Sequence, residues 1–151
     1  MKRVCLVFFL VVGMLIITAC SPRDPLTAEE FVLRMEAEGY DVQDATMFLQ
    51  DIPGLEAIII VDSDDIYIEF SLWDTEADAR RAFTGARRDF EDASGRTRSY
   101  RSQDMANFNR FQQTTDGRFE AVTRVENTVL IIETTAEHRN LADAVLEALG
   151  Y

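Results

Sequence analysis

The side chains that could do chemistry in this sequence are few and scattered. His138 is the only histidine, and it falls in the first turn of a predicted helix, where a solvated position is commoner than a catalytic base. Asp62, Asp64 and Asp65 could bind a hard cation such as Ca²⁺. The spaced calcium loop with its downstream glutamate is absent, however, so a solvated acidic turn is the favoured interpretation.

A hydrolytic enzyme would have to use carboxylates such as Glu69 or Asp74, close to Trp73. Trp73 shares one face of a predicted strand with Tyr67, and the pair could line a ligand site, although cover by a helix is favoured. Serine–lysine and nucleophile-elbow motifs are absent, and Lys2 is the only lysine. We therefore predict that the chain is not an enzyme and has no catalytic, metal-binding or cofactor-binding residue.

The first twenty residues have the layout of an export signal. Lys2 and Arg3 form a short positive region, and an apolar stretch runs from Val4 to Ile17, interrupted only by Gly13. Small residues follow, which is the arrangement of a secretory signal peptide. We therefore expect residues 1–19 to be removed on export.

The end of this segment, Ile17-Thr18-Ala19-Cys20, resembles a bacterial lipobox, in which an aliphatic residue and two small residues precede an invariant cysteine. Ile17 stands where leucine is more usual. The resemblance implies cleavage before Cys20, lipidation of its sulfur, and anchoring at the extracytoplasmic face of the cell membrane. Beyond this signal the chain resembles small bacterial lipoproteins in size and layout only, and no domain family is identified.

Two alternatives remain open for the N-terminal segment. A helix from Val4 to Cys20 would span about 26 Å, slightly short of the roughly 30 Å of a bilayer core, so an uncleaved single-span anchor is one of them. A plain signal peptide cut after Ala19 is the other, and it would leave a free N-terminal thiol. Because Cys5 lies inside the apolar stretch, neither alternative gives the exported domain an internal disulfide.

The net charge of −12 argues against nucleic acid as a partner, but the charges are unevenly distributed. Residues 21–79 contain sixteen acids and two arginines, whereas residues 80–124 contain ten arginines and six acids. Mutual neutralisation across the folded surface is the favoured interpretation. The alternative is that the arginines at 80–110 form a basic face for an anionic partner or a lipid head group.

The rest of the chain reads as a short linker and one domain. Residues 20–26 contain two prolines and would hold the domain within about 20 Å of the membrane. Ser21 permits sorting to an outer membrane, by resemblance to the known sorting rule. The single domain is expected over residues 27–151, which is long enough for one core.

The first half of this domain has strong local signals. Thr27 and Glu30 form a capping box for a helix over residues 28–38, with Gly39 as its stop. Residues 42–52 predict an irregular strand or loop, residues 57–61 a buried strand, and residues 66–72 the returning strand of a hairpin. A second helix is expected from Thr75 to Ala93, with Arg80 and Arg88 among the residues off its apolar face.

In the second half, the polar residues 95–106 predict a surface loop. Strands are expected at 107–115, 118–125 and 128–134, with Asp116-Gly117 as a hairpin turn, followed by a helix that stops at Gly150. The resulting order, α-β-β-β-α-β-β-β-α, predicts an α+β fold with an antiparallel sheet of five to six strands and about three helices on one face. Similar sequences at residues 35–40 and 146–151 suggest a weak internal repeat.

These features predict a lipid-anchored binding or accessory module for an envelope protein, attached to the membrane through Cys20. The alternative is a small-ligand or lipid carrier with an apolar pocket between the sheet and the helices.

Overall fold

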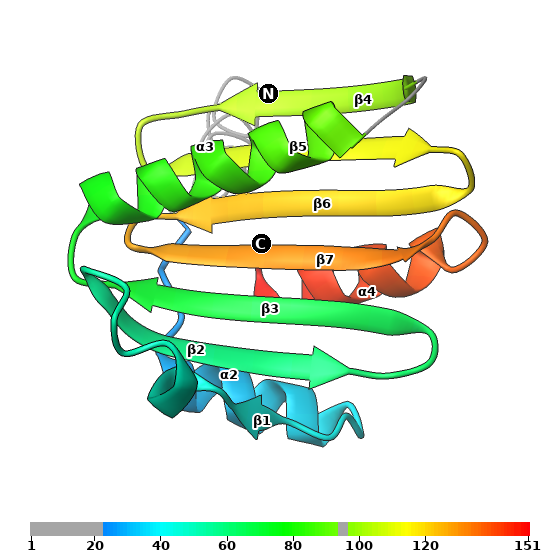
Figure 1. Cartoon of the computed structure of the whole chain (residues 1–151). Coiled ribbons are helices and arrows are strands. Elements are labelled where there is room, and N and C mark those ends of the chain that lie inside the picture. Colours follow the sequence, from blue (N-terminus) through cyan, green and yellow to red (C-terminus); the bar gives the residue numbers. More distant parts are fainter. Residues whose placement is uncertain (1–22, 94–96) are drawn as a thin grey trace, which may run out of the picture.

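A computed structural model describes residues 23–93 and 97–151. The predicted signal peptide, Cys20 and the first linker residues lie outside these ranges. The described part forms an α+β fold around one antiparallel sheet (Figure 1). In chain order the elements are α2 (Ala28–Ala37), β1 (Gln43–Asp44), the 3-10 helix η2 (Thr46–Phe48), β2 (Leu55–Asp62), β3 (Ile66–Trp73), α3 (Glu76–Ala93), β4 (Thr97–Asp104), β5 (Phe108–Thr115), β6 (Arg118–Val125), β7 (Thr128–Thr135) and α4 (Arg139–Leu149).

The sheet has seven strands in the order β1-β2-β3-β7-β6-β5-β4, and every neighbouring pair is antiparallel. The α+β class with three α-helices in the described residues is confirmed, but the strand number exceeds the expected five to six. The difference comes mainly from β4, in the segment expected to be a loop. Because β4 lies at the edge of the sheet, it needs few apolar residues. Its polar sequence therefore gives no indication that it pairs with β5.

The helices cover both faces of the sheet, so the prediction that they pack on one face is wrong. α3 crosses the front of the sheet, whereas α4 runs behind it (Figure 1). α2 and α4 share a hydrophobic core with one face, and α3 packs on the other. The reason lies in the middle strands: in β7, Leu130 and Ile132 point to one face while Val129 and Ile131 point to the other, and both faces need cover.

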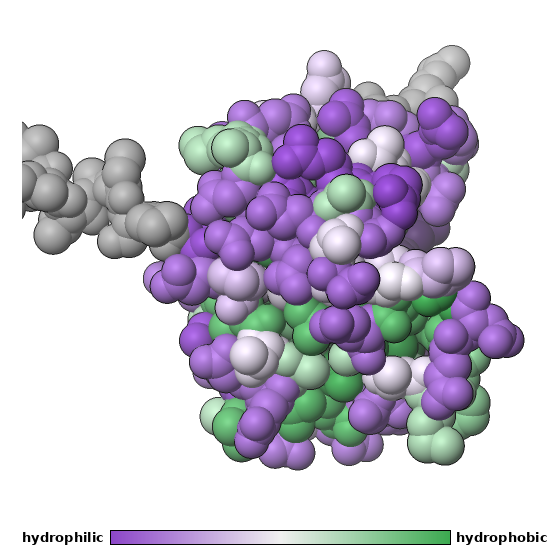
Figure 2. All heavy atoms as spheres, turned by 90° about the vertical axis from the view of Figure 1, so that its left-hand side faces the viewer, coloured by the Kyte–Doolittle hydropathy of each residue, from purple (hydrophilic) through white to green (hydrophobic). Residues whose placement is uncertain are grey.

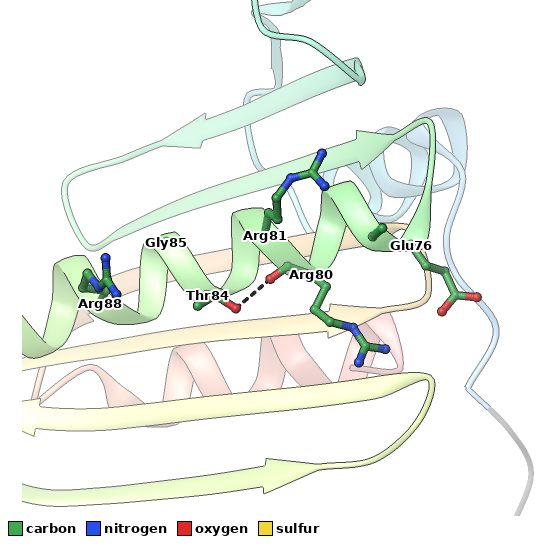
Figure 3. Close-up of a pocket in the computed structure, with 7 residues that line it drawn as sticks. Glu76, Arg80, Arg81, Thr84, Gly85 and Arg88 are labelled. Carbon is green, nitrogen blue, oxygen red and sulfur yellow. Dashed lines mark hydrogen bonds between the residues drawn. The ribbon is translucent and has the colours of Figure 1, made fainter.

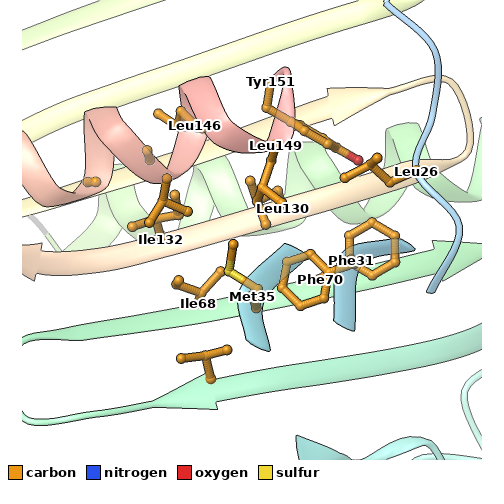
Figure 4. Close-up of a cluster of buried hydrophobic side chains, with 14 of the residues drawn as sticks. Leu26, Phe31, Met35, Ile68, Phe70, Leu130, Ile132, Leu146, Leu149 and Tyr151 are labelled. Atoms are coloured by element: carbon orange, nitrogen blue, oxygen red, sulfur yellow. The ribbon is translucent and has the colours of Figure 1, made fainter. Parts of the chain in front are cut away.

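The core between the sheet and the helices α2 and α4 is filled by large side chains (Figure 4). The rings of Phe31 and Phe70 stack with centroids 4.7 Å apart. Leu146 and Leu149 of α4 contribute to the same cluster. The carrier alternative would place its ligand in this layer, which these side chains occupy.

The predicted helix ends of the first half are confirmed. The backbone N–H of Glu30 donates to Thr27 Oγ1 at 3.1 Å, and the Glu30 carboxylate accepts from the Thr27 N–H at 2.9 Å. Gly39 has φ +87°, and the N–H of Tyr40 donates to the Met35 carbonyl at 3.0 Å. This pattern is a Schellman motif, which satisfies carbonyls that the helix leaves free.

The last helix ends in the same way. Gly150 has φ +80°, and the N–H of Tyr151 donates to the Leu146 carbonyl at 2.9 Å. The similarity between residues 35–40 and 146–151 thus corresponds to two equal helix ends. Asp116 and Gly117 both have positive φ, as the expected hairpin turn requires. No helix in the described ranges combines the length and hydrophobicity needed to cross a bilayer.

Candidate functional site

Helix α3 separates an apolar face from a basic face, as its sequence predicts. Ala79, Phe83 and Phe90 are buried against the sheet. At the start of the helix the N–H of Asp78 donates to Thr75 Oγ1 at 3.1 Å, which is the expected cap. The arginines lie outside the buried stripe, so burying the apolar face presents them away from the sheet.

The outer face of α3 carries a hollow of about 680 Å³ (Figure 3). Gly85 is one of the residues that line it, and no atom outside its own helix neighbourhood comes within 4 Å of where a Cβ would stand. Arg80 and Arg81 extend to opposite sides of the helix around this hollow (Figure 3). The lining residues are Glu76, Ala77, Arg80, Arg81, Thr84, Gly85 and Arg88.

A second hollow of about 380 Å³ lies between α3 and the strands β4 and β5. It shares Arg80, Thr84 and Arg88 with the first hollow, so the two form one continuous surface. We call the union of these two hollows, centred on the three shared residues, the basic groove.

The positive charge of the basic groove is only partly neutralised. Arg81 pairs with Asp78, and Arg87 Nε lies 2.9 Å from Glu91 Oε1. Arg80 donates to the carbonyl of Ala106 at 3.2 Å, which leaves its charge uncompensated. The side chain of Arg88 has no hydrogen bond or ion pair with the residues the structure describes. The groove can therefore accept negative charge at Arg80 and Arg88.

The other side of α3, above β3 and β7, is acidic. A hollow of about 360 Å³ there is lined by residues that include Tyr67, Glu69, Asp89 and Glu133. The hydroxyl of Tyr67 donates to Glu69 Oε2 at 2.9 Å. Burial raises the pKa of Tyr67, and the negative charge of Glu69 raises it further. The side of α3 above β3 and β7 thus carries acidic side chains, whereas the basic groove carries arginines.

Beneath α3, Arg124 of β6 is fully buried, with 0 % of its surface exposed. Its guanidinium donates to Asn109 Oδ1 at 2.6 Å and to the carbonyls of Glu126 at 2.6 Å and Ala106 at 3.0 Å. Burial lowers the pKa of Arg124, and Arg80 lowers it further, but an arginine stays charged at ordinary pH. These bonds hold the β4–β5 and β6–β7 turns together at one end of the sheet.

The structure does not bring together Glu69 and Asp74, the carboxylates that a hydrolytic enzyme would have to use. Glu69 pairs with Tyr67 within β3, while Asp74 is exposed beyond the far end of that strand. Trp73 packs against the α3 core, and its indole N–H donates to Ser71 Oγ at 3.0 Å. Cover by a helix, the favoured fate of Trp73, is confirmed.

The acidic turn and the histidine lie near each other at the surface. His138 Nδ1 is 3.4 Å from Asp65 Oδ1, and both side chains are largely exposed. Within residues 23–93 and 97–151, no three histidine, cysteine or acidic side chains are grouped so that they could hold a metal ion. Cys20, the predicted lipidation site, lies outside these ranges.

Two features were not predicted from the sequence. The segment around η2 exposes apolar side chains, with Met47 80 % and Phe48 86 % accessible. Figure 2 shows hydrophobic residues gathered in the lower half of one side of the molecule, below a hydrophilic upper half. The second feature is Arg23, whose guanidinium carbon lies 3.9 Å from the ring centroid of Phe108. Neither the exposed segment nor the contact between Arg23 and Phe108 produces a periodic pattern in the sequence.

The sequence matches no known family model and has no significant match among curated proteins. Among solved structures there are distant matches, which include the following two. A GTP-binding regulator from Thermotoga maritima is 13 % identical, with 82 % of this chain and 87 % of that chain covered and a TM-score of 0.45. The extracellular domain of PknH from Mycobacterium tuberculosis is 12 % identical, with 83 % and 92 % covered and a TM-score of 0.39. Both similarities are too distant to carry an argument about this chain.

Proposed function

We propose that this chain is a lipid-anchored extracytoplasmic binding module, in which the basic groove of α3 receives an acidic segment of an envelope protein. The observation that carries the proposal is the position of the groove relative to Arg23, the first residue that the structure describes. Arg23 packs on Phe108, which belongs to the face covered by α2 and α4, whereas the groove lies on the opposite face.

The short linker limits how the domain can be oriented on the membrane. Only Ser21 and Pro22 lie between Cys20 and Arg23, so the two Cα atoms are about 10 Å apart at most. If Cys20 carries the lipid, the α2/α4 face near β5 lies towards the bilayer. The basic groove then faces away from the membrane, where a protein partner can reach it.

The charge of the rest of the chain favours specific docking. With a net charge of −12, most of the surface repels an acidic segment, while Arg80 and Arg88 attract one. Such an arrangement directs association to one face and suppresses other encounters. The acidic hollow on the other side of α3 reinforces this, because it disfavours the reversed orientation.

Site-specific photo-cross-linking in the native membrane tests the proposal. A photoreactive amino acid replaces Gly85, where the structure leaves room for a side chain, and Ala144 on the exposed side of α4 serves as the matched control. Amine-directed reagents are unsuitable because Lys2, in the signal peptide, is the only lysine. We expect one protein to be cross-linked from position 85 and not from position 144.

The variant Arg88→Glu should reduce this cross-link severalfold, because it reverses a charge that has no partner among the described residues, and high salt should do the same. Equal cross-linking from both positions, or none from position 85, would refute docking at the basic groove.

A further inference from the structure

A second cluster of arginines lies on the opposite face of the sheet and lacks the partners that Arg124 has. The aromatic ring of Phe108 is contacted by two guanidiniums: the central carbon of Arg23 is 3.9 Å from its centroid and that of Arg110 is 5.5 Å away. Phe108 itself is almost fully buried in the α2/α4 core. Two positive charges are therefore held against one ring.

Several donors in this cluster are buried without an acceptor. Arg23 Nη1 and both Nε and Nη2 of Arg110 have no hydrogen-bond partner and almost no accessible surface. The hydroxyl of Thr123 is in the same state, and Thr123 is the cross-strand neighbour of Arg110 in β6. Buried donors without acceptors are costly and uncommon, so a group of them at one place calls for an explanation.

The charged residues around the cluster leave it with an excess of positive charge. Arg23 and Arg101 both act on Arg110 as like charges, while Asp143 of α4 is the opposing acid. Burial lowers the pKa of Arg110, and these two arginines lower it further. Within the described residues, neither Arg23 nor Arg110 has a carboxylate within ion-pair distance. One anion would compensate both guanidiniums.

We propose that Arg23 and Arg110, with the Thr123 hydroxyl beside them, form a binding site for a phosphate oxyanion. Guanidiniums bind phosphate oxygens through paired N–H donors, which are the atoms left without acceptors here. Arg110 is fixed on β5, whereas Arg23 comes from residues 23–27, which form neither helix nor strand. The two guanidiniums can therefore separate to admit an oxygen atom between them.

The position of Arg23 indicates where the phosphate comes from. With lipidated Cys20 only three residues away, Arg23 would lie at the level of the lipid head groups. A head-group phosphate bound here would fix the orientation of the domain on the membrane. This choice of source rests on the proposed lipid anchor, while the oxyanion site itself does not, since free phosphate has the same chemistry.

Thermal unfolding of the full chain in detergent, with inorganic phosphate titrated at constant ionic strength, tests the site. At ten times the dissociation constant, phosphate should raise Tm by about 5 °C. The shift should be lost in Arg110→Leu and in Arg23→Leu, and retained in Arg88→Leu, which removes an exposed arginine of the basic groove. Arg23→Leu lies outside the sheet, so it keeps the test valid if Arg110→Leu folds poorly.

Phosphate also stabilises proteins by exclusion from their surface, and such an effect would be equal in all variants. An equal shift in wild type and Arg110→Leu, no shift at all, or a shift lost only in Arg88→Leu would overturn the proposal.

A second arm identifies the source, by comparing nanodiscs of phosphatidylglycerol with nanodiscs of phosphatidylcholine. Stabilisation by phosphatidylglycerol that disappears in Arg110→Leu assigns the site to a lipid head group. Phosphate binding in detergent without that lipid effect overturns the head-group source and assigns the site to free phosphate. Neither arm depends on a partner bound at the basic groove, where Arg88→Leu serves only as a control. Failure of the phosphate test therefore leaves the cross-linking test at Gly85 unaffected, and failure of the cross-linking test leaves the phosphate test unaffected.

Discussion

Arg124 and Arg110 lie on neighbouring strands, project to opposite faces of one sheet and meet opposite environments. Arg124 is fully buried and donates to Asn109 and to two turn carbonyls. Arg110 is half-buried, and two of its three nitrogens are enclosed without an acceptor. The difference shows that burial alone does not reveal what an arginine does. A complete set of acceptors indicates a structural role, whereas missing acceptors need an explanation, which for Arg110 we propose is a bound anion.

The largest effect should come from Arg124→Leu. The substitution leaves the buried Asn109 Oδ1 and the partly buried Glu126 carbonyl without their donor, while the Ala106 carbonyl keeps its hydrogen bond from Arg80. We expect the free energy of unfolding to fall by about 3–5 kcal/mol, as when one partner of a buried charged network is removed. Urea denaturation of wild type and variant measures the difference. A loss below about 1 kcal/mol would mean that Arg124 is not structural.

A neutral pair on the α2/α4 face should give an intermediate effect. Thr128 Oγ1 lies 2.6 Å from the hydroxyl of Tyr151 and donates to the Val125 carbonyl at 2.7 Å. Tyr151→Phe removes one of these bonds and leaves the other, so we expect a loss of about 1 kcal/mol. The same denaturation series measures it. A loss as large as that of Arg124→Leu would mean that removing one neutral hydrogen bond costs as much as removing the whole Arg124 network. The number of hydrogen bonds would then not explain the difference between Arg124 and Arg110.

Arg110→Leu should change stability least among these core substitutions. The variant removes buried donors that have no acceptor and relieves the repulsion by Arg23 and Arg101, while keeping an apolar side chain near Phe108. We expect a change of about 1 kcal/mol or less, of either sign, in phosphate-free buffer. If Arg110→Leu destabilises the protein as much as Arg124→Leu, the contrast between the two sites is wrong.

The acid dependence of stability should come from carboxylates and leave both arginines charged. Hydrogen bonds from the backbone and hydroxyl of Thr27 lower the pKa of Glu30 below its ordinary value of 4.5, and those from Thr46 lower the pKa of Asp44. A lowered folded-state pKa gives stability that is present above the unfolded pKa and is lost as pH falls through the folded one.

Glu30→Gln should therefore be less stable than wild type at pH 6, and the gap should close as pH falls below about 4. Denaturation midpoints across this range provide the measurement, with Glu29→Gln, an exposed neighbour, as the control. A gap that widens at low pH would contradict the sign.

Local signals in the sequence predicted local structure well. The capping box of Thr27 and Glu30 and the glycine stop at Gly39 depend on residues within a few positions of each other, and both are confirmed. The apolar stripe of α3 is likewise a property of one segment. In contrast, β4 was missed because an edge strand made of polar residues has the composition of a loop.

Features that depend on pairing between strands far apart in the sequence could not be predicted from the periodicity of apolar residues. Helices on both faces follow from how β7 lies between β3 and β6, which places apolar residues on each side. The basic side chains of α3 were predicted. The sequence did not predict that every guanidinium nitrogen of Arg124 has an acceptor, whereas Nε and Nη2 of Arg110 have none. Such differences require the strand register, which composition does not contain.

The proposed acylation of Cys20 would set which face of the sheet points away from the membrane, and so whether the basic groove of α3 could meet an envelope protein. The most direct measurement is the intact mass of the protein recovered from bacterial membranes. We predict a chain that begins at Cys20 and carries a diacylglyceryl group. An uncleaved chain of 151 residues, or one that begins at Cys20 without lipid, would contradict the anchored module.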